Sequence, residues 1–384
     1  MPGQYDTIVI GAAGAMGSAA CYHLARRGGR VLGVDQFAVG HDRGSSHGLS
    51  RMIRMCYYEH PDYVLLLRRA YELWRELERA SGERVLFTPG GVYLGREDAE
   101  AVAGARRAAV EHGLAHEMVS RAEVRRRWPQ FEVPAEFVGL FEPEAGWLKP
   151  ELAIATHVRL ARAMGAEIRE SERVVAWEAD GGGGVRVRTE HAEYRGRALV
   201  IAAGVWASRV VNGLGVAITP TRQVLGWFQP RDARAFEGPD APVWAVETPR
   251  EWDGRGDLFY GFPMAAEGLK VARHAPGAVI DPDRDGRETR AGDEEDIRPF
   301  LRRFMPMAEG PLSMLRVCMY ENSPDLHFVI DKHPRHENVV VAAGFSGHGF
   351  KFASVVGEVL ADLAVRGETG QPVGFLGLKR FSHR

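Results

Sequence analysis

The chain has 384 residues, of which 45% are hydrophobic and 26% are charged, an ordinary balance for a soluble globular protein. A chain of this length is too long to fold around one simple hydrophobic core, so two domains are expected. The 49 Lys and Arg residues against 51 Asp and Glu leave a formal net charge of −2, which indicates neither a nucleic-acid-binding nor a membrane-binding surface.

The three cysteines, Cys21, Cys56 and Cys318, are far apart and lack metal-ligand spacing. Neither a metal site nor a disulfide framework is expected, and a reducing compartment fits. No apolar run approaches the ~18 residues of a spanning helix, and the chain enters its first strand near Thr7 without a leader-like segment. The sequence therefore predicts a cytoplasmic location and no membrane partner.

The first part of the chain reads as a βαβ unit. Residues 6–11 are apolar and β-branched, as in a buried parallel strand, and a helix rich in small residues follows until Gly28. Residues 30–35 form a second strand that ends in Asp35. An acid at this position suits the ribose hydroxyls of a dinucleotide, so dinucleotide binding is predicted.

The glycine spacing in this unit departs from the usual fingerprint. Gly11, Gly14 and Gly17 follow the pattern GxxGxxG, with one more residue between the first two glycines than GxGxxG has. Either the turn is wider or Ala12 takes the place of the first glycine. A structural βαβ unit without a ligand remains the alternative.

Residues 44–54, GSSHGLSRMIR, form a glycine-serine loop that leads into a segment with Arg51 and Arg54. Their spacing of three places both guanidinium groups on one side if the segment is helical. The alternative is a pair of surface arginines.

The middle of the chain alternates helices with short strands. Helical patterns, with an apolar face, a capping box or an early proline, cover residues 62–79, 97–112, 120–128 and 150–164. A strand over 88–95 is expected to lead into a second domain.

Strands follow around Ile168 and Val174, then a hairpin through residues 181–184 and a buried strand within 198–207. Short alternating segments between residues 223 and 271 favour a mixed or antiparallel sheet that can enclose a small pocket. A helix over residues 293–304 ends before Pro306.

The C-terminal part holds two further features. Cys318 lies in a hydrophobic, strand-like context, where a cysteine is usually an inert small hydrophobe. Residues 339–352, VVVAAGFSGHGFKF, predict a buried strand, a glycine-rich turn and a helix starting near His348. Amides at a helix start favour an anion or an electron-rich heterocycle, and Lys351 adds a full charge. A tight turn into a packed helix is the alternative.

Several motifs together resemble the monomeric sarcosine oxidase family, whose relatives include N-methyltryptophan oxidase and pipecolate oxidase. The resemblance runs over essentially the whole chain. Besides the N-terminal βαβ unit, it rests on G-S-x-H-G-x-[ST]-R-x-I-R at 44–54, YGFP at 260–263, GLKxxxH at 268–274, VCMY at 317–320 and AAGFSGHGFKF at 342–352.

The resemblance implies an α/β fold with two domains. A Rossmann-like, glutathione-reductase-like FAD-binding domain would comprise residues 1–87, 150–220 and 318–384. A mixed-sheet α+β substrate domain would comprise residues 88–149 and 221–317, and its sheet would roof the flavin. A monomer without a nucleic-acid or protein partner is implied.

The activity implied is an FAD-dependent oxidase of N-methyl amino acids. Sarcosine, oxygen and water would give glycine, formaldehyde and hydrogen peroxide, by hydride transfer to a covalent flavin. Within this class, an N-methyltryptophan or pipecolate oxidase stays open.

The resemblance also implies roles for individual residues. Cys318 matches the cysteine that carries FAD through a thioether to the flavin 8α-methyl group. Arg54 and Lys351 would clamp the substrate carboxylate, and Lys270 would activate oxygen. The catalytic set would be Lys270, Arg51, His274, Tyr260 and Tyr320. The other cofactor contacts implied are Gly11, Gly14, Gly17, Asp35, Ser45, His47, Ser50, Arg51, Val174, Gly204, Gly347 and Lys351.

The sequence departs from the family at Ser46, where a histidine is common beside His47, and at Ser50, where a threonine is common. Met55 and Cys56 stand where a His-Ala pair is common. These changes border the expected flavin and pocket, so substrate preference and flavinylation rate are expected to differ.

Two other classes of protein share part of these features. An NAD(P)-dependent dehydrogenase could use the same βαβ unit but has no need of the Cys318 motif and the C-terminal glycine turn. A flavin-binding redox sensor without turnover has little use for Arg54 and Lys351 beside Lys270 and His274.

Overall fold

The computed structural model describes residues 4–180, 183–238, 241–254, 256–284 and 287–382. Its first sheet is built on parallel strands from distant parts of the chain. The strands of this sheet are β1 (Tyr5–Ile10), β2 (Val31–Val34), β9 (Glu167–Arg169), β10 (Val174–Ala179), β11 (Val185–Thr189), β12 (Glu193–Ile201), β18 (Val329–His333) and β19 (His336–Ala343). Their order is β10-β11-β12-β1-β2-β9, with β19 also paired to β12 and β18 paired to β19.

The centre of this sheet explains why its strands read as continuous apolar runs. β1 pairs in parallel with β2 and β12, and β12 pairs in parallel with β19. Val9 and Val200 are fully buried on the face that the helices cover, and Ile8 and Leu199 are fully buried in a separate core cluster on the other face. The carboxyl ends of these strands therefore meet at one edge, where a ligand of an open α/β sheet binds.

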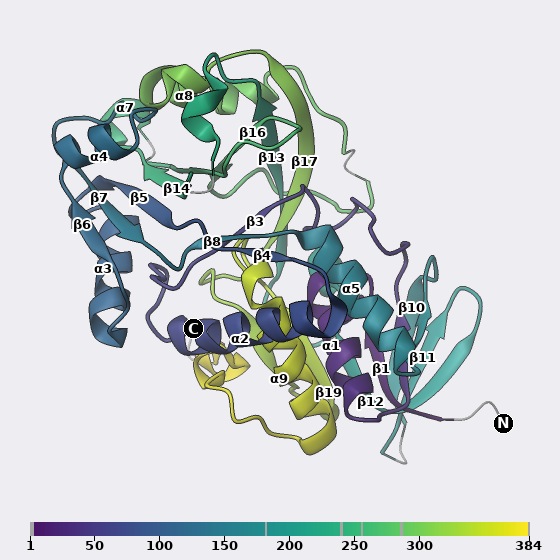
Figure 1. Cartoon of the computed structure of the whole chain (residues 1–384). Helices are drawn as coiled ribbons and strands as arrows, with labels where there is room; N and C mark the ends of the chain where they lie inside the picture. The colour runs from purple at the N-terminus through teal and green to yellow at the C-terminus, as the bar shows by residue number, and fades with distance from the viewer. Residues whose placement is uncertain (1–3, 181–182, 239–240, 255, 285–286, 383–384) are drawn as a thin grey trace.

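Four helices pack together beside the first sheet: α1 (Ala15–Arg26), α2 (Tyr63–Ser81), α5 (Pro150–Ala163) and α9 (Ala353–Arg366). α1 contacts both α5 and α9, and α2 contacts α9 (Figure 1). The helix predicted over 62–79 is confirmed, and Gly82 ends it in the left-handed conformation.

The second sheet is mixed, as the alternating segments predicted. It runs β17-β13-β16-β15-β14-β5-β7-β6, and only β14 and β5 among its described pairs are parallel. Its strands are β5 (Gly91–Arg96), β6 (Glu117–Val119), β7 (Phe137–Glu142), β13 (Thr219–Phe228), β14 (Val243–Glu247), β15 (Leu258–Gly261), β16 (Leu269–His274) and β17 (Leu312–Asn322).

Shorter helices cover the outer side of the second sheet, seen at the upper left of Figure 1. They are α4 (Arg121–Arg127), α7 (Arg250–Asp253) and α8 (Arg298–Phe304), whereas α3 (Glu100–His112) packs on the other face of the sheet, lower on the left of Figure 1. The predicted cap of α4 is present, since the Glu123 amide donates to Ser120 Oγ at 3.3 Å. β10 and β11 form the predicted hairpin, but Gly181 and Gly182 of its turn lie outside the described residues.

Two expectations about local structure were wrong. Arg51 and Arg54 do not share a helix, because residues Arg51–Ile53 form strand β3 of a small sheet with β4 (Leu86–Phe87) and β8 (Gly146–Leu148). Near the C-terminus the α-helix begins at Ala353 rather than near His348. Between the end of β19 and this helix, Ser346 is left-handed (φ 47°) and Phe350–Phe352 form the 3-10 turn η5.

Within the described ranges, none of the helices combines the length and the apolarity needed to cross a bilayer. The remaining short elements are α6 (Ala207–Val210) and the 3-10 turns η1 (Gly204–Trp206), η2 (Ala233–Phe236), η3 (Asp293–Asp296), η4 (Pro306–Ala308), η6 (Gly374–Leu376) and η7 (Leu378–Phe381).

A buried ion pair ties η3 to β13. Both Arg222 Nη1 and Nη2 donate to the Asp293 carboxylate at 2.7 Å, and the two side chains are only 9% and 7% exposed. Burial alone would raise the pKa of Asp293, but the hydrogen bonds from Arg222 hold it below its usual value. The stabilisation is therefore present above the ordinary aspartate pKa and is lost as the pH falls through the lowered one.

We predict that Asp293→Asn lowers the free energy of unfolding by about 3 kcal/mol, because it leaves the buried Arg222 without a counter-ion. Urea unfolding measures the change as a shift of the midpoint. The matched control is Asp232→Asn, whose partner Arg234 is exposed and whose loss is expected to leave the midpoint unchanged. Equal midpoints for the two variants would contradict the prediction.

Candidate active site at the junction of the two sheets

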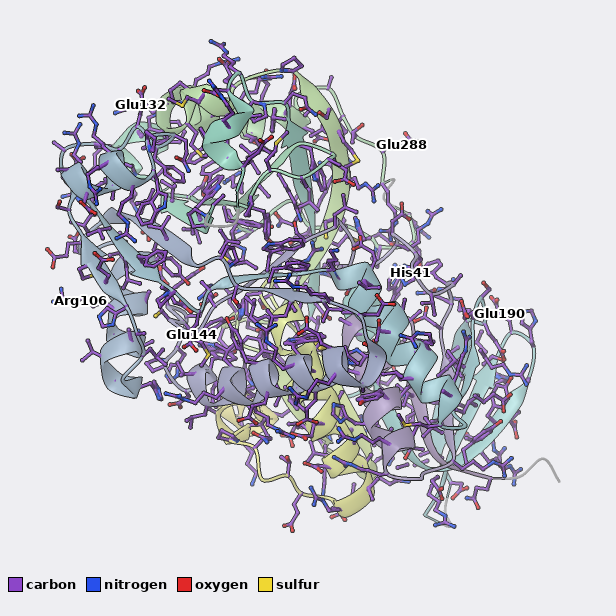
Figure 2. The ribbon with its side chains drawn as sticks, viewed as in Figure 1. His41, Arg106, Glu132, Glu144, Glu190 and Glu288 are labelled. Atoms are coloured by element: carbon purple, nitrogen blue, oxygen red, sulfur yellow. The ribbon has the colours of Figure 1, made fainter. Side chains whose placement is uncertain are left out.

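A cavity of about 520 Å³ runs from the β1–α1 turn to the second sheet. His41 and Glu190 belong to its wall and lie beside β10 and β11, at the right of Figure 2. Of the residues singled out from the sequence, its wall contains Gly11, Gly14, Asp35, Ser45, Arg51, Arg54, Val174, Gly204, Tyr260, His274, Cys318, Tyr320, Gly347 and Lys351. Gly17, His47, Ser50 and Lys270 are not part of this wall.

The β1–α1 turn answers the question about glycine spacing. Gly11, not Ala12, has the positive φ (92°), and its carbonyl accepts from the Gly14 amide at 3.0 Å. A Cβ on Gly17 would lie 2.0 Å from that carbonyl oxygen, so only glycine allows this approach. The extra residue is thus absorbed in a closed turn that leads directly into α1.

The start of α1 fits a bound diphosphate. Gly14 precedes the helix without a side-chain cap, and the first turn contains no acidic residue. The first amides of a helix carry partial positive charge, which favours an anion. A dinucleotide fits this end of the cavity.

Asp35, directly after β2, stands in the wall of the same cavity. Its Oδ2 accepts from the Ala13 amide and its Oδ1 from the Phe37 amide, each at 2.9 Å. Burial raises the pKa of Asp35 to about 6, although these amides oppose the rise. The two oxygens retain lone pairs for the hydroxyls of a ribose.

Cys318 lies at the other end, beside Arg51. The Cys318 thiol is 2% exposed, and its Sγ is 3.7 Å from both Arg51 Nη2 and the Ser45 carbonyl oxygen. The Arg51 guanidinium is fixed because it donates to the carbonyls of Ser45 and Ser50 at 2.8 Å. The loop before β3 therefore positions a cation against this thiol.

Lys270 reaches the back of that loop. Its Nζ donates to the carbonyls of Gly48 (2.7 Å) and Ser50 (2.8 Å) and contacts Ser50 Oγ at 3.2 Å. Burial and the nearby Arg51 lower the pKa of Lys270, whereas three oxygen acceptors match the three donors of an ammonium group. His47 is also buried here, with neither ring nitrogen bonded within the described chain. These residues lie behind the cavity wall, and their roles stay predictions.

Arg54 is buried in the cavity wall and paired with Glu59, a residue that sequence reasoning missed. Arg54 Nη2 donates to both carboxylate oxygens of Glu59, at 2.6 and 2.8 Å. Burial opposes the charge on Glu59, but Arg54 holds its pKa at about 2. Nη1 of Arg54 has no hydrogen-bond partner among the described residues. The sequence offers one signal for this ion pair, an acidic residue five positions after Arg54.

Lys351 and His348 complete this group of polar side chains. Lys351 Nζ donates to the His348 carbonyl at 2.8 Å, and burial together with the nearby Arg54 lowers its pKa to about 7. His348 Nδ1 lies 2.5 Å from the Tyr57 hydroxyl and 4.0 Å from Glu59. The C-terminal turn therefore brings Lys351 to the cavity beside Arg54.

Tyr320, His274 and Tyr260 line the same end of the cavity from the second sheet. The Tyr320 hydroxyl is 3.0 Å from His274 Nδ1, and burial lowers the pKa of His274 to about 4, so the imidazole is neutral at pH 7. A Cβ on Gly347 would lie 2.3 Å from the Tyr320 ring. The glycine turn therefore allows this ring to pack against the C-terminal segment.

A parallel sheet with a glycine turn, an acid at the ribose position and a cavity that continues under a second, mixed sheet defines a two-domain flavin-dependent oxidoreductase. The family model described as "DAO: FAD dependent oxidoreductase" matches residues 6–363. The chain belongs to this family and is an FAD-dependent oxidoreductase, which excludes the nicotinamide-dependent alternative.

Individual relatives agree with this assignment. The chain is 43% identical to a monomeric sarcosine oxidase of Streptomyces avermitilis, over 100% of this chain and 99% of that protein. It is 38% identical to an N-methyl-L-tryptophan oxidase of Citrobacter koseri, over 94% and 95% of the two chains. The solved structure of NikD, "an unusual amino acid oxidase essential for nikkomycin biosynthesis", superposes with a TM-score of 0.83 at 25% identity, covering 97% of each chain.

The β1–α1 turn gives a test of the cofactor end. We predict that Gly17→Ala lowers the FAD content of the purified protein by roughly tenfold, because the added Cβ cannot fit beside the Gly11 carbonyl. Flavin absorbance per mole of protein measures this. Gly370→Ala, where a Cβ meets open space, is the control and keeps full FAD content. Full FAD content in Gly17→Ala would contradict the prediction.

Proposed function

We propose that this protein oxidises N-methyl amino acids, with sarcosine as the substrate. Sarcosine, oxygen and water would yield glycine, formaldehyde and hydrogen peroxide. The observation that carries the proposal is the buried pair of cations, Arg54 and Lys351, in the cavity wall at the Cys318 end. Two buried cations there suit a small substrate with a carboxylate. The similarity to sarcosine oxidases supports the choice of substrate.

When bound, FAD would accept the hydride from the carbon next to the amine and pass the electrons to oxygen. Arg54 Nη1, which has no partner within the described residues, would donate to the substrate carboxylate, and Lys351 would add a second charge-assisted bond. Such bonds contribute ~1.5–3 kcal/mol each, enough to orient a small ligand. Neutral His274 and the hydroxyls of Tyr260 and Tyr320 would surround the amine without repelling it.

Cys318 is the residue that we propose carries FAD through a thioether to the 8α-methyl group. Its place supports this, since Cys318 is part of the cavity wall and its Sγ lies 3.7 Å from Arg51 Nη2. Lys270 would place positive charge where oxygen is reduced. We further propose a cytoplasmic monomer, which suits the three free cysteines and the word "monomeric" in the relatives' names.

An N-methyl-L-tryptophan oxidase is the second candidate, because relatives of that activity cover nearly the whole chain at 37–38% identity. A peroxide assay with sarcosine, N-methyl-L-tryptophan and pipecolate separates the candidates. The highest kcat/KM is expected for sarcosine. A higher value for either larger amine would replace the substrate, and no peroxide from any of them would contradict the proposal.

Covalent attachment has its own test. Acid precipitation of the protein is expected to leave the yellow flavin in the pellet, and Cys318→Ser is expected to release it to the supernatant. Cys21→Ser, at a buried cysteine that is not part of the cavity wall, is the control and keeps the flavin in the pellet. Flavin in the supernatant of the unmodified protein would contradict the thioether.

The carboxylate clamp predicts a large effect at Arg54. Arg54→Met is expected to raise KM for sarcosine at least about tenfold, because the charge-assisted hydrogen bond from Nη1 to the carboxylate is lost. Steady-state peroxide production measures it. Arg234→Met, at an exposed arginine in a surface ion pair, is the control and leaves KM unchanged. A KM within about threefold of the parent would show that Arg54 does not bind the carboxylate.

A further inference from the structure

Glu321 is a buried carboxyl group of the cavity wall to which the roles above give no task. It follows Tyr320 on β17 and is 5% exposed. Its Oε2 has no hydrogen-bond partner within the described parts of the chain. A buried carboxyl oxygen without a partner is costly, unless a ligand supplies the missing partner.

The neighbours of Glu321 place it between two strand ends of the first sheet. Along β17, Cys318 and Tyr320 face one way, and Met319 packs on the opposite side against Val205 and Trp206 of η1, the turn after β12. The alternation puts Glu321 on the Met319 side. The amides of Gly344 and Phe345, which follow β19, are close enough to the Glu321 carboxyl to lower its pKa. Glu321 therefore stands where the turns after β12 and β19 meet.

This position corresponds to one part of the FAD molecule. The turn at Gly11 and Asp35 suits the adenosine diphosphate end, and the chamber at Cys318 suits the ring. The part of FAD that joins these two ends is the ribityl chain, which carries hydroxyl groups. We propose that Glu321 holds the ribityl chain of FAD through a hydrogen bond from its carboxyl group. The proposal rests on the use of FAD, and neither on the amine substrate nor on the thioether.

The protonation of Glu321 agrees with this role. Burial raises the pKa of Glu321 to about 8, opposed by the amides of Gly344 and Phe345, and no charged side chain of the described residues contributes. The carboxyl is therefore mostly neutral at pH 7. A neutral carboxyl carries one O–H donor, which can hydrogen-bond to a ribityl hydroxyl.

FAD affinity in the Cys318→Ser background tests the proposal, since cofactor binding is then reversible. Glu321→Met keeps the length of the side chain but cannot hydrogen-bond, and we expect FAD to bind about tenfold more weakly. Glu321→Gln keeps a donor, and we expect affinity within about threefold of the parent. Titration of the apoprotein with FAD, followed by flavin fluorescence, gives the dissociation constants.

Thermal unfolding of the apoproteins separates this role from a structural one. Glu321→Met removes a desolvated carboxyl that pairs with no side chain but that faces the amides of Gly344 and Phe345, so its apoprotein is expected to unfold at about the same temperature as the parent. A lower unfolding temperature together with weaker FAD binding would make Glu321 a structural residue and overturn the proposal. Unchanged FAD affinity in Glu321→Met would overturn it as well.

The pH dependence of FAD binding gives a second measurement. If FAD binds the neutral acid, affinity falls as the pH rises above about 8, because the proton must be restored on binding. Glu321→Gln has no such proton, so its affinity lacks this decline. Lys351 in the same cavity also titrates, at about pH 7, but in both proteins, so the difference between their profiles reports Glu321. Identical profiles would overturn the proposal even if Glu321→Met does not fold.

Discussion

The parallel pairing of β1, β12 and β19 is the constraint on which the site depends. Parallel strands end at the same edge, so the segments that follow them are brought together however distant they are in sequence. The turn after β1 starts α1, the turn after β12 contains Gly204, and the turn after β19 contains Gly347 and Lys351. Three regions of the chain thereby form one wall of a single cavity. The opposite wall comes from β15, β16 and β17 of the second sheet, which present Tyr260, His274 and Cys318.

Charge inside this cavity is stabilised by partners and not by water. Burial of the Arg54 charge would be energetically costly without a counter-ion. Both carboxylate oxygens of Glu59 accept hydrogen bonds from Arg54, and three tyrosine rings surround its guanidinium group. A substrate carboxylate that binds Arg54 would therefore meet a guanidinium already charged and oriented. The same pair limits affinity, because Glu59 repels a second carboxylate. Lys351, with its pKa lowered to about 7, offsets part of that repulsion when it is protonated.

The sequence predicted those parts of the site that depend on local rules. The βαβ unit, the capping box at Ser120, the mixed second sheet and the family followed from periodicity, caps and motifs. The start of the C-terminal helix was misplaced, because Ser346 adopts a left-handed conformation that a non-glycine residue rarely takes. The pairing of Arg54 with Glu59 and the contact of Lys270 with Gly48 were not predicted. Such contacts depend on how the loop before β3 folds over β16, and no spacing in the sequence encodes that distance. Glu321 looked like an ordinary strand residue for the same reason.

Three carboxyl groups in one cavity differ because their surroundings differ. Asp35 is buried but receives two amide hydrogen bonds, so its pKa rises only to about 6 and it accepts hydrogen bonds at pH 7. Glu59 is equally hidden from water, yet Arg54 holds its pKa at about 2, and it acts as a counter-ion. Glu321 has amides but no cation, so its pKa of about 8 leaves it neutral and able to donate. Burial raises the pKa in each case, and the nearest charge decides the outcome. Along the cavity, Asp35 is an acceptor, Glu321 a donor and Arg54 a paired cation. This order matches FAD, which has hydroxyl groups on its ribose and on its ribityl chain, followed by a substrate that carries a carboxylate.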